Sequence, residues 1–220
     1  KWKKYLKPLY KTSDIKKWKL SRNRLNVLYS SPHKKIDDDL FLKHIDKFQE
    51  PLLWIRKTNK ENLENWLYLR RWISNSSIYE NIPKIITWYR VRYNSFTYTE
   101  DESCWSQDVY FITYNNSNNN NLNLKYIVWL LNSKLYYNWF YYRWKRKWDI
   151  LELYQKPLSE VPIKDISKEE QKPFINLVDQ IIEITKNEDY LERDDLQKQV
   201  KVLEKQIDDM VYKLYELSDE

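Results

Sequence analysis

The pattern of hydrophobic and polar positions alternates between strand-like and helix-like segments up to about residue 165 and is helical from there on. Residues 108–114 are apolar on both alternating faces, a pattern typical of an interior strand. We expect this segment to pair with 95–99 across a loop at 100–106. Further extended segments are predicted at 25–29, 84–90, 151–154 and 161–163.

Helical spacing is found in five segments, the last of which ends at Leu217. Residues 37–39 supply capping carboxylates for a helix that runs to Phe48, and a second helix is predicted at 60–69. A long helix is predicted at 123–142. Ser167 and Glu170 form a capping-box pattern before another helix. The mixture predicts an α+β fold, in which a small mixed sheet packs against helices.

The last segment carries apolar residues at alternating steps of four and three, which is the a/d seam of a helix that packs lengthwise on another helix. These residues are Leu196, Val200, Leu203, Ile207, Met210, Leu214 and Leu217. The partner is either the preceding helix, in an antiparallel hairpin, or a second polypeptide. We therefore expect two domains, residues 1–165 and a helical hairpin or coiled-coil arm at 166–220.

The charge is unevenly distributed. Residues 1–150 hold 28 Lys and Arg against 14 Asp and Glu, whereas residues 151–220 hold 10 against 18. A basic body followed by an acidic segment is typical of a nucleic-acid binder whose last part has another role. Biased base composition, which favours Lys and Asn codons, is the alternative.

Composition excludes several kinds of chemistry. The chain has one Cys, two His and no Gly, so a disulfide, a cysteine metal cluster and a glycine-rich phosphate loop are all ruled out. The two histidines, His33 and His44, do not suggest a catalytic triad or a zinc site. No apolar run is long enough to span a membrane, and a cytoplasmic location is expected. The chain therefore reads as a binding module rather than a catalyst.

A cluster of four cations lies between an aromatic helix and a strand-like run, at Arg143, Lys145, Arg146 and Lys147. Apolar flanks would hold these cations on an ordered turn, where they could contact a polyanion. Arg and amide side chains near residues 90–107 could make forked contacts with base edges. The alternative for both groups is a solvated charged surface.

Several segments, in order, resemble the C-terminal specificity (target-recognition) domain of adenine-N6 DNA methyltransferases of the TaqI and Eco57I type, which belong to restriction–modification systems. Leu-Leu-Asn-Ser-Lys-Leu at 130–135 and Ser-Gln-Asp-Val-Tyr-Phe-Ile at 106–112 carry the resemblance. It is extended by Lys-Arg-Lys at 145–147, Leu-Glu-Leu-Tyr-Gln-Lys-Pro-Leu at 151–158 and the segment 9–18.

The resemblance implies that the chain reads a sequence in double-stranded DNA. S-adenosylmethionine and the Asn-Pro-Pro-Tyr motif would belong to an N-terminal methyltransferase domain of the same polypeptide. This chain lacks that motif, so it would bind no cofactor and catalyse no transfer alone. The residues expected to contact DNA are Lys16, Lys17, Arg90, Arg92, Asn94, Ser106, Gln107, Arg143, Lys145, Arg146 and Lys147.

Tryptophan stands where the family pattern leads us to expect glycine, at Trp105, Trp129, Trp144 and Trp148, in a chain with 11 Trp and no Gly. Our hypothesis is that some of these codons are UGA, read as glycine in the source organism. Two other functions stay open: a non-catalytic interaction module that docks through its helical arm, and an RNA-binding module whose aromatic side chains stack on bases.

Overall fold

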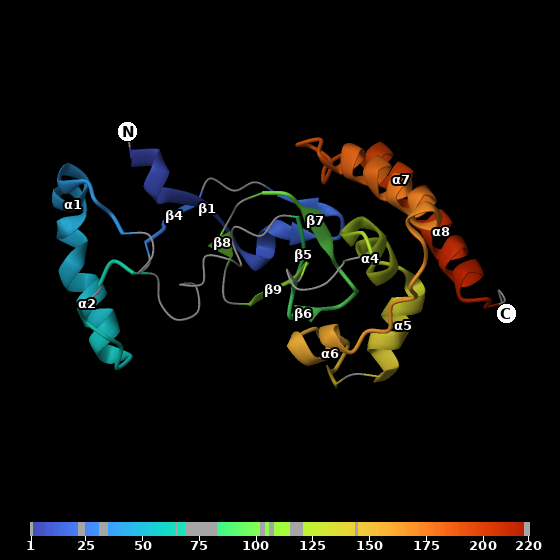
Figure 1. Cartoon of the computed structure of the whole chain (residues 1–220), viewed down its shortest axis with the longest axis horizontal. Helices are drawn as coiled ribbons and strands as arrows, with labels where there is room; N and C mark the ends of the chain where they lie inside the picture. The colour runs from blue at the N-terminus through green and yellow to red at the C-terminus, as the bar shows by residue number, and fades with distance from the viewer. Residues whose placement is uncertain are drawn as a thin grey trace. The chain divides into compact units, whose positions relative to one another are not determined.

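The computed structural model describes residues 2–21, 25–30, 35–64, 66–68, 83–101, 104–105, 108–114, 121–143 and 145–217. The chain forms two compact units (Figure 1). The first comprises Lys1–Leu9, Arg24–Glu80 and Glu102–Cys104, and the second comprises Tyr10–Asn23, Asn81–Asp101 and Trp105–Glu220. The fold is α+β, as predicted, with small antiparallel sheets and packed helices.

In its described residues, the first unit combines a strand pair with two short α-helices. Its elements are η1 (Trp2–Tyr5), β1 (Leu6–Tyr10), β4 (Asn26–Leu28), α1 (Asp39–Ile45), η3 (Asp46–Phe48) and α2 (Gln49–Thr58). β1 and β4 pair antiparallel, and Tyr5, Phe41 and Ile45 form the buried cluster. The Asp38 side chain accepts a hydrogen bond from the backbone N–H of Phe41, so the predicted acidic cap of α1 is confirmed.

The second unit contains most of the strands. They are β2 (Ile15–Lys16), β3 (Lys19–Leu20), β5 (Lys84–Trp88), β6 (Arg90–Val91), β7 (Thr97–Thr99), β9 (Val109–Thr113), β10 (Arg146–Lys147) and β11 (Ile150–Glu152), preceded by η2 (Thr12–Asp14). β8 (Cys104–Trp105) is the third strand of the β4–β1–β8 sheet. The other sheets have the orders β7–β5–β9, β10–β11–β6 and β2–β3.

Tyr89 connects two of these sheets. Its N–H donates to the carbonyl of Asp108 beside β9, and its carbonyl accepts from the N–H of Leu153 beside β11. The chain therefore continues from the centre of one sheet directly into the edge of the other.

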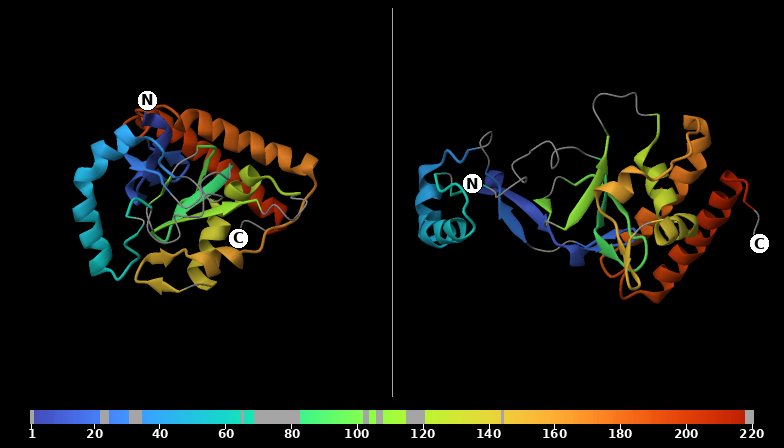
Figure 2. Two further views of the ribbon diagram at one scale, coloured as in Figure 1. Left: turned by 60° about the vertical axis from the view of Figure 1, so that its left-hand side comes forward. Right: turned by 90° about the horizontal axis from the view of Figure 1, so that it is seen from below.

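The helices described in the second unit are α4 (Leu124–Leu131), α5 (Lys134–Arg143), α6 (Gln155–Ser159), α7 (Lys168–Thr185) and α8 (Asp194–Leu214). α4 lies between the β7–β5–β9 sheet and the α7–α8 pair (Figure 2). Trp129 of α4 is fully buried, and its ring centroid lies 4.2 Å from that of Phe174 in α7. The predicted capping box is confirmed, because Ser167 and Glu170 bond reciprocally at the start of α7.

The apolar seam of α8 packs within the chain. Val200 and Ile207 are buried, and Leu203 and Met210 pack against the same core. Of the two partners left open by the sequence, the structure thus places this seam on the chain itself, mainly on α7. Leu217 is the exception, being 44% exposed. The division into domains at residues 165 and 166 stays a prediction.

Three predicted elements differ from the structure. The predicted helix at 60–69 is wrong over its described residues, which are not helical. The helix in this region is α2, which includes Pro51 in its first turn, where proline is tolerated, and ends at Thr58. The predicted pairing of 95–99 with 108–114 is wrong, because β7 and β9 each pair with β5. The predicted helix at 123–142 is broken into α4 and α5 at Asn132 and Ser133.

Candidate nucleic-acid interface

The basic cluster forms a tight hairpin. Arg146 pairs with Leu151 and Lys147 with Ile150, which leaves a two-residue turn at Trp148 and Asp149. Trp148 has φ 63°, the positive φ that the favoured two-residue hairpin turns require at their first residue. The hairpin thus presents Arg146 and Lys147 on ordered backbone, and both side chains are exposed.

A third strand brings two further predicted residues to the hairpin. β11 pairs with β6 through Leu151 with Val91 and Glu152 with Arg90. Leu151 and Val91 are buried and anchor this sheet in the core. Arg90 thereby lies on the same small sheet as the hairpin.

Acidic side chains partly neutralise the arginines of this sheet. Arg90 lies 3.8 Å from Glu152, with its guanidinium over the Tyr89 ring, and Arg92 forms an ion pair with Asp149 at 3.2 Å. The four cations of the basic cluster, Arg143, Lys145, Arg146 and Lys147, have no ion-pair partner among the described residues, and Arg146 lies over the Tyr141 ring. These four are therefore the cations most available to a polyanion.

Aromatic rings continue this surface, and they were not among the residues predicted to contact DNA. The Arg146 guanidinium lies 3.7 Å from the ring centroid of Tyr141, and Tyr137 lies one turn earlier on α5. Tyr93, which follows β6, is 5.8 Å from Tyr137. The i, i+4 spacing of two tyrosines just before a basic run was the available signal.

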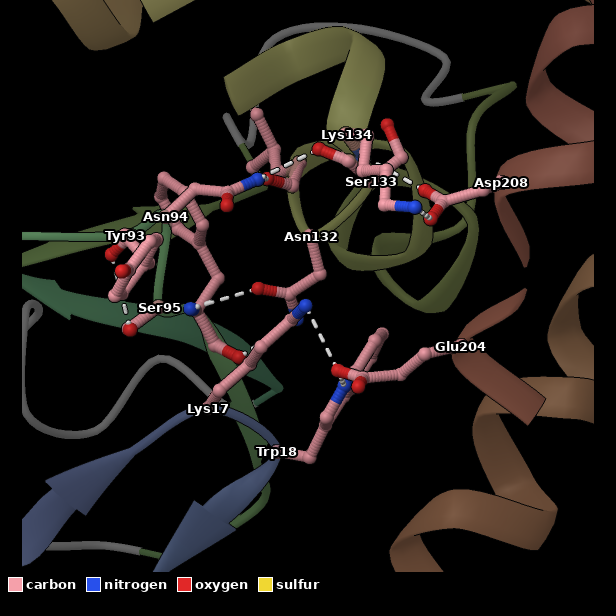
Figure 3. A network of polar contacts seen from close by, with 12 residues as sticks. Lys17, Trp18, Tyr93, Asn94, Ser95, Asn132, Ser133, Lys134, Glu204 and Asp208 are labelled. Carbon is pink, nitrogen blue, oxygen red and sulfur yellow. Dashed lines mark hydrogen bonds and ion pairs between the residues drawn. The ribbon is translucent and has the colours of Figure 1, made fainter. Parts of the chain in front are cut away.

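Asn94 was predicted to contact DNA, but it is buried and has a structural role. Its Nδ2 donates to the carbonyls of Leu131 at 2.6 Å and Ser133 at 2.8 Å (Figure 3). These carbonyls lie where the helix is interrupted, and that of Ser133 also accepts from the N–H of Tyr137 in α5. With an exposed fraction of 4%, Asn94 cannot also reach a base edge, and we remove it from the candidate interface.

Lys16 and Lys17 lie on the β2–β3 hairpin. Lys16 is exposed, while Lys17 forms an ion pair with Glu204 of α8, with Nζ and Oε1 2.7 Å apart. Glu204 also accepts a 2.9 Å hydrogen bond from Nε1 of Trp18 (Figure 3). Lys17 thus anchors α8 to this hairpin.

Lys19, which also lies on the β2–β3 hairpin, caps the C-terminal end of α7. Lys19 donates from Nζ to the carbonyls of Thr185 and Asn187, each at 2.7 Å. Burial lowers the pKa of Lys19, and nearby carboxylates, Glu192 first, oppose that shift. The ammonium caps a helix C-terminus, where a cation is favourable.

Two other predicted contacts, Ser106 and Gln107, and also Trp144, lie outside the described residues. In the part of the chain that is described, no three His, Cys, Asp or Glu side chains gather as a metal site would require. The helices searched there include none with the length and apolar character needed to cross a bilayer.

The chain matches the family model described as the TaqI-like C-terminal specificity domain over residues 7–163. Because the match spans more than half of the chain, the protein belongs to this family. Its members serve as specificity domains of TaqI-like DNA methyltransferases, so the chain has a recognition role. The match ends shortly before α7 begins. No curated protein matches the chain.

Proposed function

We propose that this chain recognises a specific sequence in double-stranded DNA on behalf of an adenine-N6 methyltransferase of a restriction–modification system in the cytoplasm. The observation that carries the proposal is the match to the specificity-domain family. The basic cluster, whose four cations lack ion-pair partners among the described residues, supports it.

In this proposal the chain is not catalytic alone. S-adenosylmethionine is bound by an N-terminal methyltransferase domain of the same polypeptide. The present chain, with no glycine, cannot build the glycine-rich loop that lets backbone amides approach a nucleotide-like cofactor. Its contribution is to position the partner domain on the correct site. We further propose that residues 1–165 do the recognition and that 166–220 form a supporting helical arm.

The proposed mechanism has two steps. Cations of the hairpin attract phosphates and displace counterions, which gives affinity without sequence preference. Arg90 on β6 and Arg92 just after it then exchange their carboxylate partners for acceptor atoms on base edges. Lys16, exposed on the β2–β3 hairpin, would add a phosphate contact.

The test compares duplex binding of the wild type with that of a variant in which Arg143, Lys145, Arg146 and Lys147 are all replaced by Gln. Titrations at about 50 mM and about 200 mM salt give the affinity and its salt dependence. We expect weaker binding and a log–log salt slope reduced by roughly one unit for each lost phosphate contact.

A control with the same loss of charge separates local contacts from net charge. Lys168, Lys198, Lys201 and Lys205 are exposed lysines of α7 and α8, and all four are replaced by Gln. This control should bind duplex nearly as well as the wild type. If the hairpin variant keeps its affinity and salt slope, the hairpin is not part of the interface. If the wild type binds no duplex even at low salt, the proposed function is wrong.

Burial of the α8 seam argues against the alternative of an interaction module with a docking arm. That alternative needs an α8 seam available to a second polypeptide. Val200, Ile207 and Val211 are instead buried against the chain's own core. DNA recognition is therefore the better supported function.

A further inference from the structure

A row of side-chain planes lies beside the basic hairpin, and we call it the tyrosine ladder: Tyr93, Tyr137, Tyr141 and Arg146. Successive tyrosine rings are 5.8 Å apart, with interplanar angles of 37° and 36°. The Arg146 guanidinium closes the row over Tyr141 at 3.7 Å. The four residues come from β10, α5 and the segment after β6, so the fold gathers them from three elements.

The ladder is a surface feature. Tyr93 is 68% exposed, and Tyr137 and Tyr141 are each partly exposed. Aromatic contacts in the core are different, since the rings of Trp129 and Phe174 pack against each other and are almost inaccessible to solvent. Rings that serve only packing are usually covered in this way, whereas the ladder leaves ring surface open to a ligand.

The neighbours of Tyr137 show that the ladder is one contiguous cluster. Burial raises the pKa of Tyr137, and the nearby hydroxyls of Tyr141 and Tyr93 raise it further, while Arg146 lowers it. The phenol is therefore neutral at physiological pH and adds no charge that would repel a phosphate. The nearest carboxylate, Asp149, is engaged by Arg92.

Open aromatic faces next to cations suit one ligand chemistry in particular. Bases stack on such faces, and the flanking cations neutralise the phosphates of the same strand. A base inside a duplex has no free face, so stacking on the ladder requires unpaired nucleotides. The charge complementarity is local, because Lys145 and Lys147 lie on either side of Arg146 and have no ion-pair partner among the described residues.

We propose that the tyrosine ladder is a stacking platform for unpaired bases of DNA. The inference rests on the proposed function and deepens it, since an enzyme that modifies a base must take that base out of the duplex and thereby creates unpaired nucleotides. The ladder holds such nucleotides while the hairpin holds the adjoining phosphates.

The experiment measures fluorescence anisotropy with a labelled single-stranded DNA of about 12 nucleotides, the scale of one single-strand site. A fully paired duplex and an RNA of the same length are titrated in parallel. The variants are Tyr93→Ala with Tyr137→Ala, and Tyr93→Phe with Tyr137→Phe. Tyr212→Ala on α8, away from the ladder, is the control.

We expect the double alanine variant to bind the single strand at least about tenfold more weakly, since stacking contributes roughly 1–3 kcal/mol per base. The double phenylalanine variant should bind normally, because the ring faces remain. Duplex affinity should change little in either. Arg146→Lys, which keeps the charge and removes the guanidinium plane, should weaken single-strand binding, and it serves as the milder test if the alanine variant does not fold.

The outcomes separate the two proposals. If the duplex is bound but the single strand is not, or if the alanine and lysine variants bind the single strand as the wild type does, the ladder proposal is overturned and the proposed function stands. Preference for RNA over DNA single strands would overturn the DNA assignment of the ladder. If only the single strand is bound, and the ladder variants lose it, the proposed function fails while the ladder is upheld.

Discussion

Arg92 and Asp149 form an ion pair, with Nε and Oδ2 3.2 Å apart, between the segment after β6 and the turn of the β10–β11 hairpin. Both side chains are largely exposed, at 73% and 65%. Such a pair contributes little to stability in water, but it places a negative charge among the cations proposed to bind phosphate. Asp149 therefore competes with a nucleic acid for the guanidinium of Arg92.

Replacement of Asp149 by Asn should strengthen duplex binding. Removal of one charge at this distance changes a surface interaction by at most about 1 kcal/mol, so we expect affinity to rise about two- to fivefold at low salt. Glu183→Gln on α7 removes the same charge from an exposed pair with Lys186 and should have no such effect. Equal tightening in both variants would mean that net charge, and not the hairpin, governs binding.

Asn132 should be among the residues most important for stability. Its side chain accepts from the N–H of Phe96 at 3.0 Å and donates to the carbonyl of Phe96 at 2.9 Å, in the buried core (Figure 3). Asn132→Ala leaves that N–H without its partner and should lower the free energy of unfolding by about 2–3 kcal/mol. Urea unfolding measures this change.

Asn138→Ala on the exposed side of α5 provides the matched control and should change stability by less than about 0.5 kcal/mol. A stability loss at Asn132 no larger than at Asn138 would contradict the role assigned to the buried amide. Asn94→Ala should behave like Asn132→Ala. Any loss of DNA binding that it causes should accompany loss of folding.

The buried amides of Asn94 and Asn132 explain why the break between α4 and α5 could not be predicted from the sequence. Helical periodicity correctly marks both α4 and α5, but it runs through Asn132 without interruption because the flanking residues keep the same apolar face. The break depends on tertiary hydrogen bonds to Phe96 and from Asn94, which no local pattern reports. The same limit applies to β5, whose central place depends on pairings with two strands that are distant in sequence.

The helix caps, which depend on contacts between residues close in sequence, were predicted correctly. The Ser167 and Glu170 capping box and the Asp38 cap follow from contacts within four residues, and both were predicted. The basic cluster was also visible as a charge run. The tyrosine ladder was not, because Tyr93 reaches Tyr137 only through the fold.

The capping box predicts a specific pH dependence. The hydroxyl and backbone N–H of Ser167 donate to the carboxylate of Glu170 and hold its pKa below the usual value. A carboxyl whose pKa is lower in the folded state stabilises the fold above its unfolded pKa and loses that effect as pH falls through the folded value. The gap in melting temperature between wild type and Glu170→Ala should thus be constant near neutrality.

Below the ordinary carboxyl pKa of 4.5 that gap should narrow steadily. Glu170→Gln is the control, since the amide can still accept a hydrogen bond but does not titrate. The gap between Gln and Ala variants should not change over the same pH range. A wild-type gap that is independent of pH would show that the carboxylate form is not what caps α7.

The hypothesis that some Trp codons are read as glycine has different structural support at different positions. Trp105 and Trp129 are buried, and the Nε1 of each has no hydrogen-bond partner among the described residues. Their rings are nevertheless well packed, Trp105 against Tyr10 at 4.9 Å. Trp18, which the hypothesis did not include, has φ 65°, but its indole is buried and bonded to Glu204. Among the tryptophans that the structure describes, only Trp148 combines φ > 0 with a largely exposed side chain.

Trp148→Gly should therefore stabilise the protein. The residue has φ 63° and an exposed fraction of 89%, so the indole incurs backbone strain and gains almost no burial in return. A left-handed conformation costs a non-glycine residue roughly 1–2 kcal/mol, partly offset by the greater freedom of glycine in the unfolded chain. We expect a net gain of about 0.5–1 kcal/mol in urea unfolding.

Tyr142→Gly is the matched comparison, because Tyr142 is 81% exposed in the same unit but lies within the helix α5. That variant should be destabilised by about 0.5–1 kcal/mol, since glycine is a poor helix former. Destabilisation by Trp148→Gly would mean that the indole is favoured at the turn, and a UGG codon there would exclude glycine as the natural residue. A UGA codon together with the expected gain would identify the turn as one that evolved around glycine, because the backbone there already adopts the conformation that a side chain opposes.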